Sequence, residues 1–312
     1  MDACELAYGT FFLLQIITGV SGNVFLLLVY THEVSTAHQL NPPDLILAHL
    51  ALANTMALLS RGIPDILSAW GLRNFLDDFG CKILLYIYRV ARGLAICTTC
   101  LLSVFQAIII RPGTSWWSGV KAQLPKCILP SCIFSWSLNL LFDITAPMFV
   151  IGLSNSTSIN RAILLKYCSS ISISAGTILV NAVVLSLRDL FFVGLMSVAS
   201  VYMVLVLYRH HRQVRHLHGP DRSLRVMPEA RAAKRVIAQV TLYILFYGRD
   251  TITLSVLLNM KENSPLVLIS NNIMAFTFST VSPFLIILSS RRMKVFWKRD
   301  SHSPTWHPSL ES

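Results

Sequence analysis

Seven long blocks of apolar residues constrain the fold of this chain more than any other feature of its sequence. A helix that crosses the hydrocarbon core of a bilayer, about 30 Å thick, needs about 20 mostly apolar residues. The blocks are long enough, and the first contains no charged residue. They predict an all-α fold, a seven-transmembrane helix bundle forming one domain over residues 1–312, with spans at 10–30, 45–66, 83–110, 127–149, 187–208, 236–258 and 266–288 and a tail at 289–312.

The overall composition supports a membrane protein. Only 13% of the residues are Asp, Glu, Lys or Arg, 54% are hydrophobic, and the mean hydropathy is +0.60. Soluble globular domains carry about 25% charged residues, so this chain lacks the charge needed to cover a fully aqueous surface.

Two other interpretations of the apolar blocks are weaker. A signal peptide at 10–30 would begin with basic residues, whereas Asp2 and Glu5 precede this block, so we expect an uncleaved first span. An eighth span at 168–187 is the other alternative, because this stretch is also uncharged. Its many Ser, Thr, Gly and Ala residues are weakly hydrophobic, and no polar loop separates it from the next block, so seven spans are favoured.

The Lys and Arg residues of the connections predict the orientation of the chain. With the N-terminus outside, the inner connections hold sixteen of them and the outer connections six, Arg61 among the six. Cytoplasmic loops are enriched in Lys and Arg, so the N-terminus is expected outside and the tail inside. The one N-glycosylation pattern, Asn155-Ser156-Thr157, falls in an outer loop of this topology.

Three of the seven cysteines, Cys4, Cys81 and Cys168, lie outside the predicted spans. They permit three single pairings, and an oxidising exterior would make a disulfide persistent. A bond between Cys81 and Cys168 would hold the second outer loop over the mouth of the bundle and leave Cys4 over. Cys97 and Cys100 form a CxxC pattern deep in a span with no second ligand pair, so we expect a helix contact there rather than a metal site.

Ionisable residues inside the spans are candidate ligand contacts, because charges at bilayer depth are costly and usually face the bundle interior. Arg89 and Arg92 share one face of the third helix, about 12 and 16 Å below Cys81 at 1.5 Å per residue. Carboxylates approach comparable depths from helices four, five and six. We predict that a polar group of a ligand binds Arg89, Arg92, Asp189 and Asp250. The alternative is that such charges, including Asp143, neutralise one another and only stabilise helix packing.

Several other membrane functions are disfavoured. A retinal protein needs a lysine for a Schiff base, and residues 266–288 contain none. A transporter would be expected to show an internal repeat, and a channel would be expected to show polar residues along successive helices. Neither pattern stands out in the sequence. An intramembrane enzyme would need a catalytic set at one depth, which the sequence does not show. We therefore expect a receptor without enzymatic activity, metal or cofactor.

The third span carries a specific family resemblance. Residues 80–107 resemble the third-helix signature of the vomeronasal type-1 receptors almost residue for residue, through Tyr86-Ile87-Tyr88-Arg89-Val90-Ala91-Arg92-Gly93-Leu94 and Cys97-Thr98-Thr99-Cys100. Supporting matches run along nearly the whole chain, from Ser21-Gly22-Asn23 to Ser282-Pro283-Phe284. The acidic-Arg-Tyr and Asn-Pro-x-x-Tyr motifs of mainstream rhodopsin-like receptors are missing, as in that family.

The resemblance implies a G-protein-coupled receptor of the plasma membrane that detects pheromone-like small molecules and activates an inhibitory-class heterotrimeric G protein. It also implies a Cys81–Cys168 disulfide and a glycan on Asn155. We further predict that positive residues of the third inner loop contact the G protein, with lipid headgroups as the alternative partner: Arg209, Arg212, Arg231, Lys234 and Arg235. A bitter-taste-type receptor and a non-signalling scaffold or dimer partner are the alternative functions.

Overall fold

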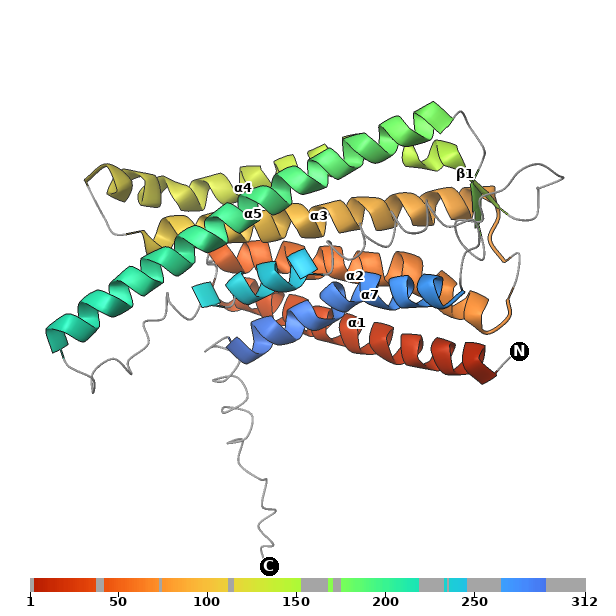
Figure 1. Cartoon of the computed structure of the whole chain (residues 1–312), viewed down its shortest axis with the longest axis horizontal. Helices are drawn as coiled ribbons and strands as arrows, with labels where there is room; N and C mark the ends of the chain where they lie inside the picture. The colour runs from red at the N-terminus through yellow and green to blue at the C-terminus, as the bar shows by residue number, and fades with distance from the viewer. Residues whose placement is uncertain are drawn as a thin grey trace, which may run out of the picture.

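The computed structural model describes residues 3–37, 42–72, 75–111, 115–152, 168–170, 175–218, 233–234, 236–245 and 265–289. These residues form a bundle of long helices (Figure 1), namely α1 (Ala3–Ala37), α2 (Pro42–Ala69), α3 (Asp78–Ile110), α4 (Ser115–Phe142), α5 (Ala175–His218) and α7 (Pro265–Ser289). A shorter apolar helix, Val236–Leu245, lies between α5 and α7 in the sequence.

Five helical segments of the described chain are long and apolar enough to cross a membrane: Gly9–His32, Pro42–Ala69, Asp78–Ile110, Ser118–Met148 and Val183–Arg209. Two shorter helical segments, Val236–Leu245 and Phe276–Leu288, are also apolar. Large apolar side chains such as Phe134 on α4 and Phe191 on α5 are exposed on the outside of the bundle. Such a surface suits contact with lipid tails rather than with water.

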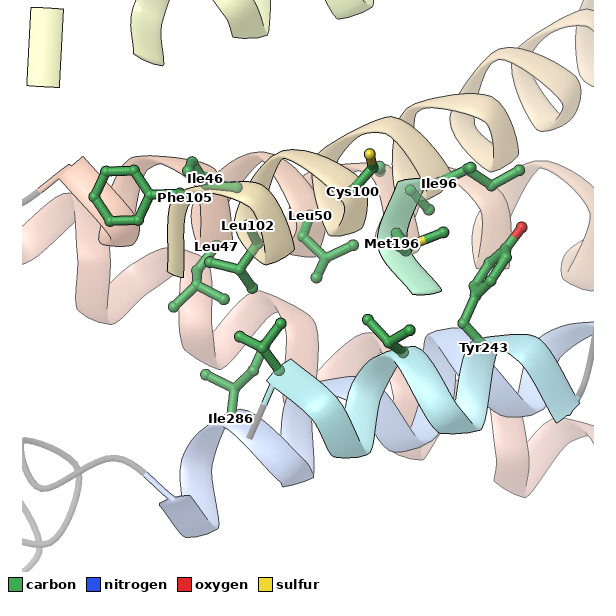
Figure 2. Packing of buried hydrophobic residues seen from close by; sticks show 14 of the residues in the cluster. Ile46, Leu47, Leu50, Ile96, Cys100, Leu102, Phe105, Met196, Tyr243 and Ile286 are labelled. Carbon is green, nitrogen blue, oxygen red and sulfur yellow. The ribbon is translucent and has the colours of Figure 1, made fainter. Parts of the chain in front are cut away.

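The centre of the bundle is built around α3, which contacts α2, α4 and α5. Figure 2 shows apolar side chains from several helices meeting there, among them Leu50 of α2, Leu102 of α3, Met196 of α5, Tyr243 of the Val236–Leu245 helix and Ile286 of α7. Because lipid is as apolar as these side chains, close van der Waals packing rather than exclusion from water drives helix association here.

Buried polar side chains add bonds between helices. The Nδ2 of Asn23 on α1 donates to the carbonyl oxygen of Ser279 on α7 at 2.9 Å, and the Nδ2 of Asn54 on α2 donates to the Oδ1 of Asn23 at 3.3 Å. The Nε2 of Gln239 donates to the Oγ of Ser282 on α7 at 3.0 Å. These bonds specify which faces of the helices meet.

The ends of α4 differ from the predicted span at 127–149. The helix begins at Ser115, so much of the expected inner connection is helical. Lys121 Nζ donates to the carbonyl oxygen of Arg111 at 2.8 Å, and this bond satisfies a carbonyl at the end of α3. The helix ends at Phe142, so Asp143 lies in the following turn rather than in helix four. Beyond this end the backbone forms tighter turns, in which Ile144 N donates to Leu141 O at 3.4 Å and Ala146 N donates to Asp143 O at 2.9 Å.

Two further segments also differ from expectation. Residues 175–187 belong to the continuous helix α5 and form its first turns. Arg61, which the charge count placed in an outer connection, lies inside α2, where the Asp65 carboxylate one turn later compensates its charge.

One small sheet departs from the all-helical pattern. After the 3-10 turn η1 (Ala146–Phe149), strand β1 (Val150–Gly152) pairs antiparallel with β2 (Cys168–Ser170), and Gly152 lies opposite Cys168. In Figure 1 β1 lies at the same end of the bundle as the N-terminus, whereas α5 runs towards the opposite end.

Candidate functional site

A continuous chain of ion pairs joins α3, the end of α4 and α5. Arg89 Nε lies 2.9 Å from the Oδ1 of Asp143, whose Oδ2 lies 3.0 Å from the Nη1 of Arg188. The Nη2 of Arg188 lies 2.9 Å from the Oδ1 of Asp189, whose Oδ2 lies 3.3 Å from the Nη2 of Arg92. The five charges thus alternate in sign from Arg89 to Arg92, and both oxygens of each carboxylate bind a guanidinium.

The members of this chain differ in their access to solvent. The side chains of Asp143, Asp189 and Arg188 are only 1%, 4% and 6% exposed, whereas that of Arg92 is 42% exposed. An unpaired charge in such a buried position would be costly, which explains why Arg188 has a carboxylate on either side. Arg188 therefore stabilises the centre of the chain, and Arg92 is its most accessible guanidinium.

A glycine allows α4 and α5 to approach α3 at this level. A Cβ atom on Gly93 would overlap the Oδ1 of Asn139 and lie 3.3 Å from the Nη1 of Arg188. That same Nη1 lies 3.4 Å from Asn139 Oδ1, and the Asn139 amide is held by a 2.7 Å bond to the carbonyl oxygen of Ser135. The missing side chain at Gly93 thus leaves room for the Asn139 side chain and, more narrowly, for the Arg188 guanidinium.

The structure brings together three of the four residues expected to bind a ligand. Arg89, Arg92 and Asp189 belong to one ion-pair chain, whereas Asp250 lies outside the described residues. Arg188 and Asn139 are not among the residues predicted to bind a ligand, and Asp143 is predicted only as a neighbouring charge. Two signals were available: Arg188 is a charge in an apolar block, and Asn139 precedes Asp143 by one helical turn.

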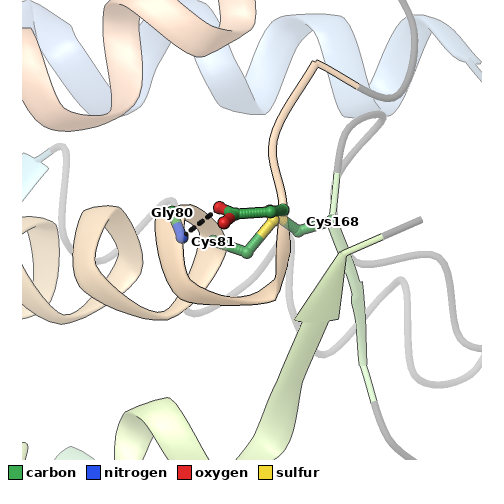
Figure 3. Close-up of a disulfide and its surroundings, with 4 residues drawn as sticks. Gly80, Cys81 and Cys168 are labelled. Atoms are coloured by element: carbon green, nitrogen blue, oxygen red, sulfur yellow. Dashed lines mark hydrogen bonds between the residues drawn. A yellow bond between two sulfur atoms is a disulfide. The ribbon is translucent and has the colours of Figure 1, made fainter. Parts of the chain in front are cut away.

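The hairpin at the N-terminal end of the bundle is tied to the start of α3. Of the three pairings that the sequence permits, the structure forms Cys81–Cys168, with Cα atoms 6.0 Å apart, and this bond joins α3 to β2 (Figure 3). The side chain of Asp77 caps α3 by accepting a 2.7 Å hydrogen bond from the backbone nitrogen of Gly80. The disulfide thus holds β2 beside the first turn of α3, and the cap completes that turn. Asn155 lies outside the described residues.

The opposite end of the bundle carries exposed cations. Arg209 and Arg212 on the last turns of α5 are exposed, as is Lys234 just before the Val236–Leu245 helix. Arg231 and Arg235, the other predicted G-protein contacts, lie outside the residues whose side chains are described.

The helix bundle has the fold of a seven-helix membrane receptor. The structure matches the crystal structure of squid rhodopsin with a TM-score of 0.74, over 96% of this chain and 81% of that chain, at 17% sequence identity. A likeness at that identity establishes the fold alone.

The family follows from the sequence comparison. The family model of the vomeronasal organ pheromone receptors matches residues 6–299, and the chain belongs to this family. It is 39% identical to olfactory receptor class A-like protein 1 of Danio rerio over 295 residues, which are 94% of this chain and 92% of that protein. It is 36% identical to vomeronasal type-1 receptor 3 of Homo sapiens over 296 residues, 95% of this chain and 94% of that receptor. The chain is thus a multi-pass membrane receptor and not an enzyme.

Proposed function

We propose that this chain is a chemosensory receptor that binds pheromone-like small molecules and activates a heterotrimeric G protein of the inhibitory class. The proposed location is the plasma membrane, in a single domain that crosses it seven times, with the N-terminus outside and residues 289–312 inside. The observation that carries the proposal is the ion-pair chain within the helices, which ends in the accessible guanidinium of Arg92. Charges at bilayer depth typically mark ligand or ion sites.

The proposed ligand contacts are Arg92, Arg89, Asp189 and Asp250. The pair between Arg92 and Asp189, at 3.3 Å, is the longest of the four links in the chain, and it includes the most exposed member. A hydrogen-bond-accepting group of a ligand would therefore displace Asp189 from Arg92 more readily than it would displace Asp143 from Arg89. The second pair is shorter, at 2.9 Å, and Asp143 is buried.

This competition provides a route from binding to signalling. The Arg92–Asp189 pair links α3 to α5, and α5 continues to His218 at the opposite end of the bundle. A ligand that replaces Asp189 as the partner of Arg92 loosens this link. It then shifts the equilibrium between two helix arrangements to the extent that it binds one arrangement more tightly than the other. The positive residues beyond Arg209 would then meet the G protein.

A panel of small carboxylic acids, alcohols and ketones tests the binding proposal, with a promiscuous G protein as the reporter. We expect a response in the wild type that R92A and R89A abolish or strongly reduce at matched surface abundance. K82Q is the matched control, because Lys82 is a cation on the same helix outside the ion-pair chain. An unchanged response of R92A and R89A would refute the binding site, and a surface receptor that never responds would favour the non-signalling dimer partner.

Charge reversal tests the proposed G-protein contact. R209E/R212E should abolish nucleotide exchange at matched receptor abundance, in nanodiscs of neutral lipid as well as of anionic lipid. If the loss of exchange occurs only in anionic lipid, these residues bind headgroups rather than the G protein.

The proposed orientation has an independent test. N155Q should remove a glycosidase-sensitive increase in apparent mass, because only the outer side of the membrane is glycosylated. An N-terminal epitope should be reached by antibody on intact cells, and a C-terminal epitope only after permeabilisation. Epitopes on the same side would contradict a seven-span chain.

A further inference from the structure

A second charged centre lies at the interface of α2, α3 and α7, apart from the ion-pair chain. Arg61 of α2 lies 3.6 Å, Nε to Oδ2, from Asp65 one turn later on the same helix. The Cζ of Arg61 also lies 4.9 Å from the ring centroid of Tyr88 on α3 and 5.8 Å from that of Phe276 on α7. A guanidinium at such distances is attracted to the face of an aromatic ring.

The rings around Arg61 contact one another. Phe276 lies 6.2 Å from Tyr88 and 5.2 Å from Phe12 of α1, between ring centroids. Phe276 and Phe12 are fully buried, so their positions are set by packing, whereas Tyr88 is only partly buried. Phe276, packed in turn on Phe12, therefore supports one side of Tyr88, and Arg61 adds a cation.

This centre lies at nearly the same depth as the candidate ligand site. Arg61 precedes the end of α2 by eight residues, and Tyr88 follows Cys81 by seven, which places them about 12 and 10 Å from the same end of the bundle. Tyr88 directly precedes Arg89 in the chain.

Helical geometry links Tyr88 to Arg92. The two residues are four apart on α3, so they are about 40° apart around the helix axis and their Cβ atoms lie about 6 Å apart. The partly buried ring of Tyr88 and the accessible guanidinium of Arg92 therefore form neighbouring parts of one α3 face.

We propose that Arg61 is a positioning residue of the ligand site: charge-paired with Asp65, it orients the ring of Tyr88, and this ring forms the apolar surface beside Arg92. The inference rests on the proposed function, because it adds an apolar contact to that same site. It defines the ligand class as a molecule with a hydrogen-bond-accepting group and a hydrocarbon body that begins about one helical turn away.

The orientation of Tyr88 can be measured without any ligand. We would incorporate 3-fluorotyrosine at position 88 of the full chain in nanodiscs and record the ¹⁹F resonance of the wild type, R61K and R61Q/D65N. The double variant removes both charges, so that no unpaired carboxylate stays buried. We expect its resonance to shift and broaden, with R61K in between, because Lys keeps the charge but not the planar stacking surface. An unchanged resonance in R61Q/D65N overturns the proposal.

The matched control carries the label at Tyr243, which packs edge-on against Phe278 at a centroid distance of 5.1 Å, away from Arg61. This resonance should be the same in all variants, and a shift there as large as at Tyr88 would reveal a general loss of structure and overturn a local role. If R61Q/D65N fails to fold, the same comparison is made between the wild type and R61K, and an unchanged Tyr88 resonance again overturns the proposal.

Signalling assays connect this orientation to the ligand site. With the most potent compound of the screening panel, R61Q/D65N and Y88L should each raise the half-maximal concentration about tenfold with an unchanged maximal response. The variant that combines R61Q, D65N and Y88L should have the same half-maximal concentration as Y88L alone. Unchanged potency in a variant whose Tyr88 resonance has moved overturns the ligand-site role. Failure of R92A to alter the response would instead refute the proposed function and leave the resonance result standing.

Discussion

Arg188 and Asp189 are neighbours in the chain and also bind each other, since the Nε and Nη2 of Arg188 lie 3.0 and 2.9 Å from the Oδ1 of Asp189. Adjacent residues on a helix diverge by about 100°, so the long side chain of Arg188 must bend back to make this contact. The bend leaves its Nη1 directed at Asp143, 3.0 Å away. One buried guanidinium thus compensates a carboxylate of α5 and another from the turn that follows α4.

Replacing this guanidinium should destabilise the receptor strongly. R188Q would deprive Asp143 and Asp189 of their shared partner, and breaking a buried ion pair costs about 3 kcal/mol or more. We expect a markedly lower melting temperature of the purified protein and less of it at the cell surface. R188K, which keeps the charge but loses the two-sided geometry, should lie between R188Q and the wild type. A wild-type melting temperature for R188Q would show that the ion-pair chain does not stabilise the fold.

Filling the space at Gly93 should disturb the same network without changing any charge. In G93A the added methyl group would overlap Asn139 and press on Arg188, and overpacking of this kind costs about 1–3 kcal/mol. Thermal unfolding should detect the loss. The control is G194A on α5, where no atom lies within 4 Å of the added carbon. Because Ala favours helix over Gly, G194A should be neutral or slightly stabilising. Equal effects of the two substitutions would argue against the close approach at Gly93.

The buried bond between Gln239 and Ser282 predicts an asymmetry between single and double variants. S282A removes the acceptor of the Gln239 amide, and leaving a buried donor unsatisfied costs about 1–3 kcal/mol. Q239L/S282A replaces both partners with apolar groups, and it also removes the Oε1 of Gln239, a buried acceptor without a partner among the described residues. The double variant should therefore melt at a higher temperature than S282A. If the double variant loses as much stability as S282A and Q239L together, the two side chains do not form a direct bond.

Loss of the disulfide should loosen the hairpin beside the N-terminal end of α3. The bond closes a loop of 87 residues, and removing a native disulfide typically costs about 2–5 kcal/mol. C81S, C168S and the double variant should all lower the melting temperature equally, because each breaks the same bond. Peptide mapping without reductant should recover the linked peptides in the wild type only. Different effects of the two single substitutions would point to another pairing, such as one with Cys4.

Some of the site was predictable because depth along a helix can be counted. Each residue adds 1.5 Å, so the positions of Arg89, Arg92 and Asp189 along their helices follow from the sequence. The rotation of one helix about its axis relative to another cannot be counted in this way. For that reason the sequence is compatible both with charges that bind a ligand and with charges that neutralise one another, and it does not reveal the role of Arg188.

The sequence by itself determined the class of this protein, because a bilayer requires long apolar blocks and the third-helix signature is specific to one family. Only the tertiary structure decided which charges pair. The partners of Arg188, Asp143 and Asp189, come from different elements, and the rings beside Arg61 come from α3 and α7. Pairings across helices depend on small features such as the missing side chain of Gly93, whose effects appear only when the helices pack.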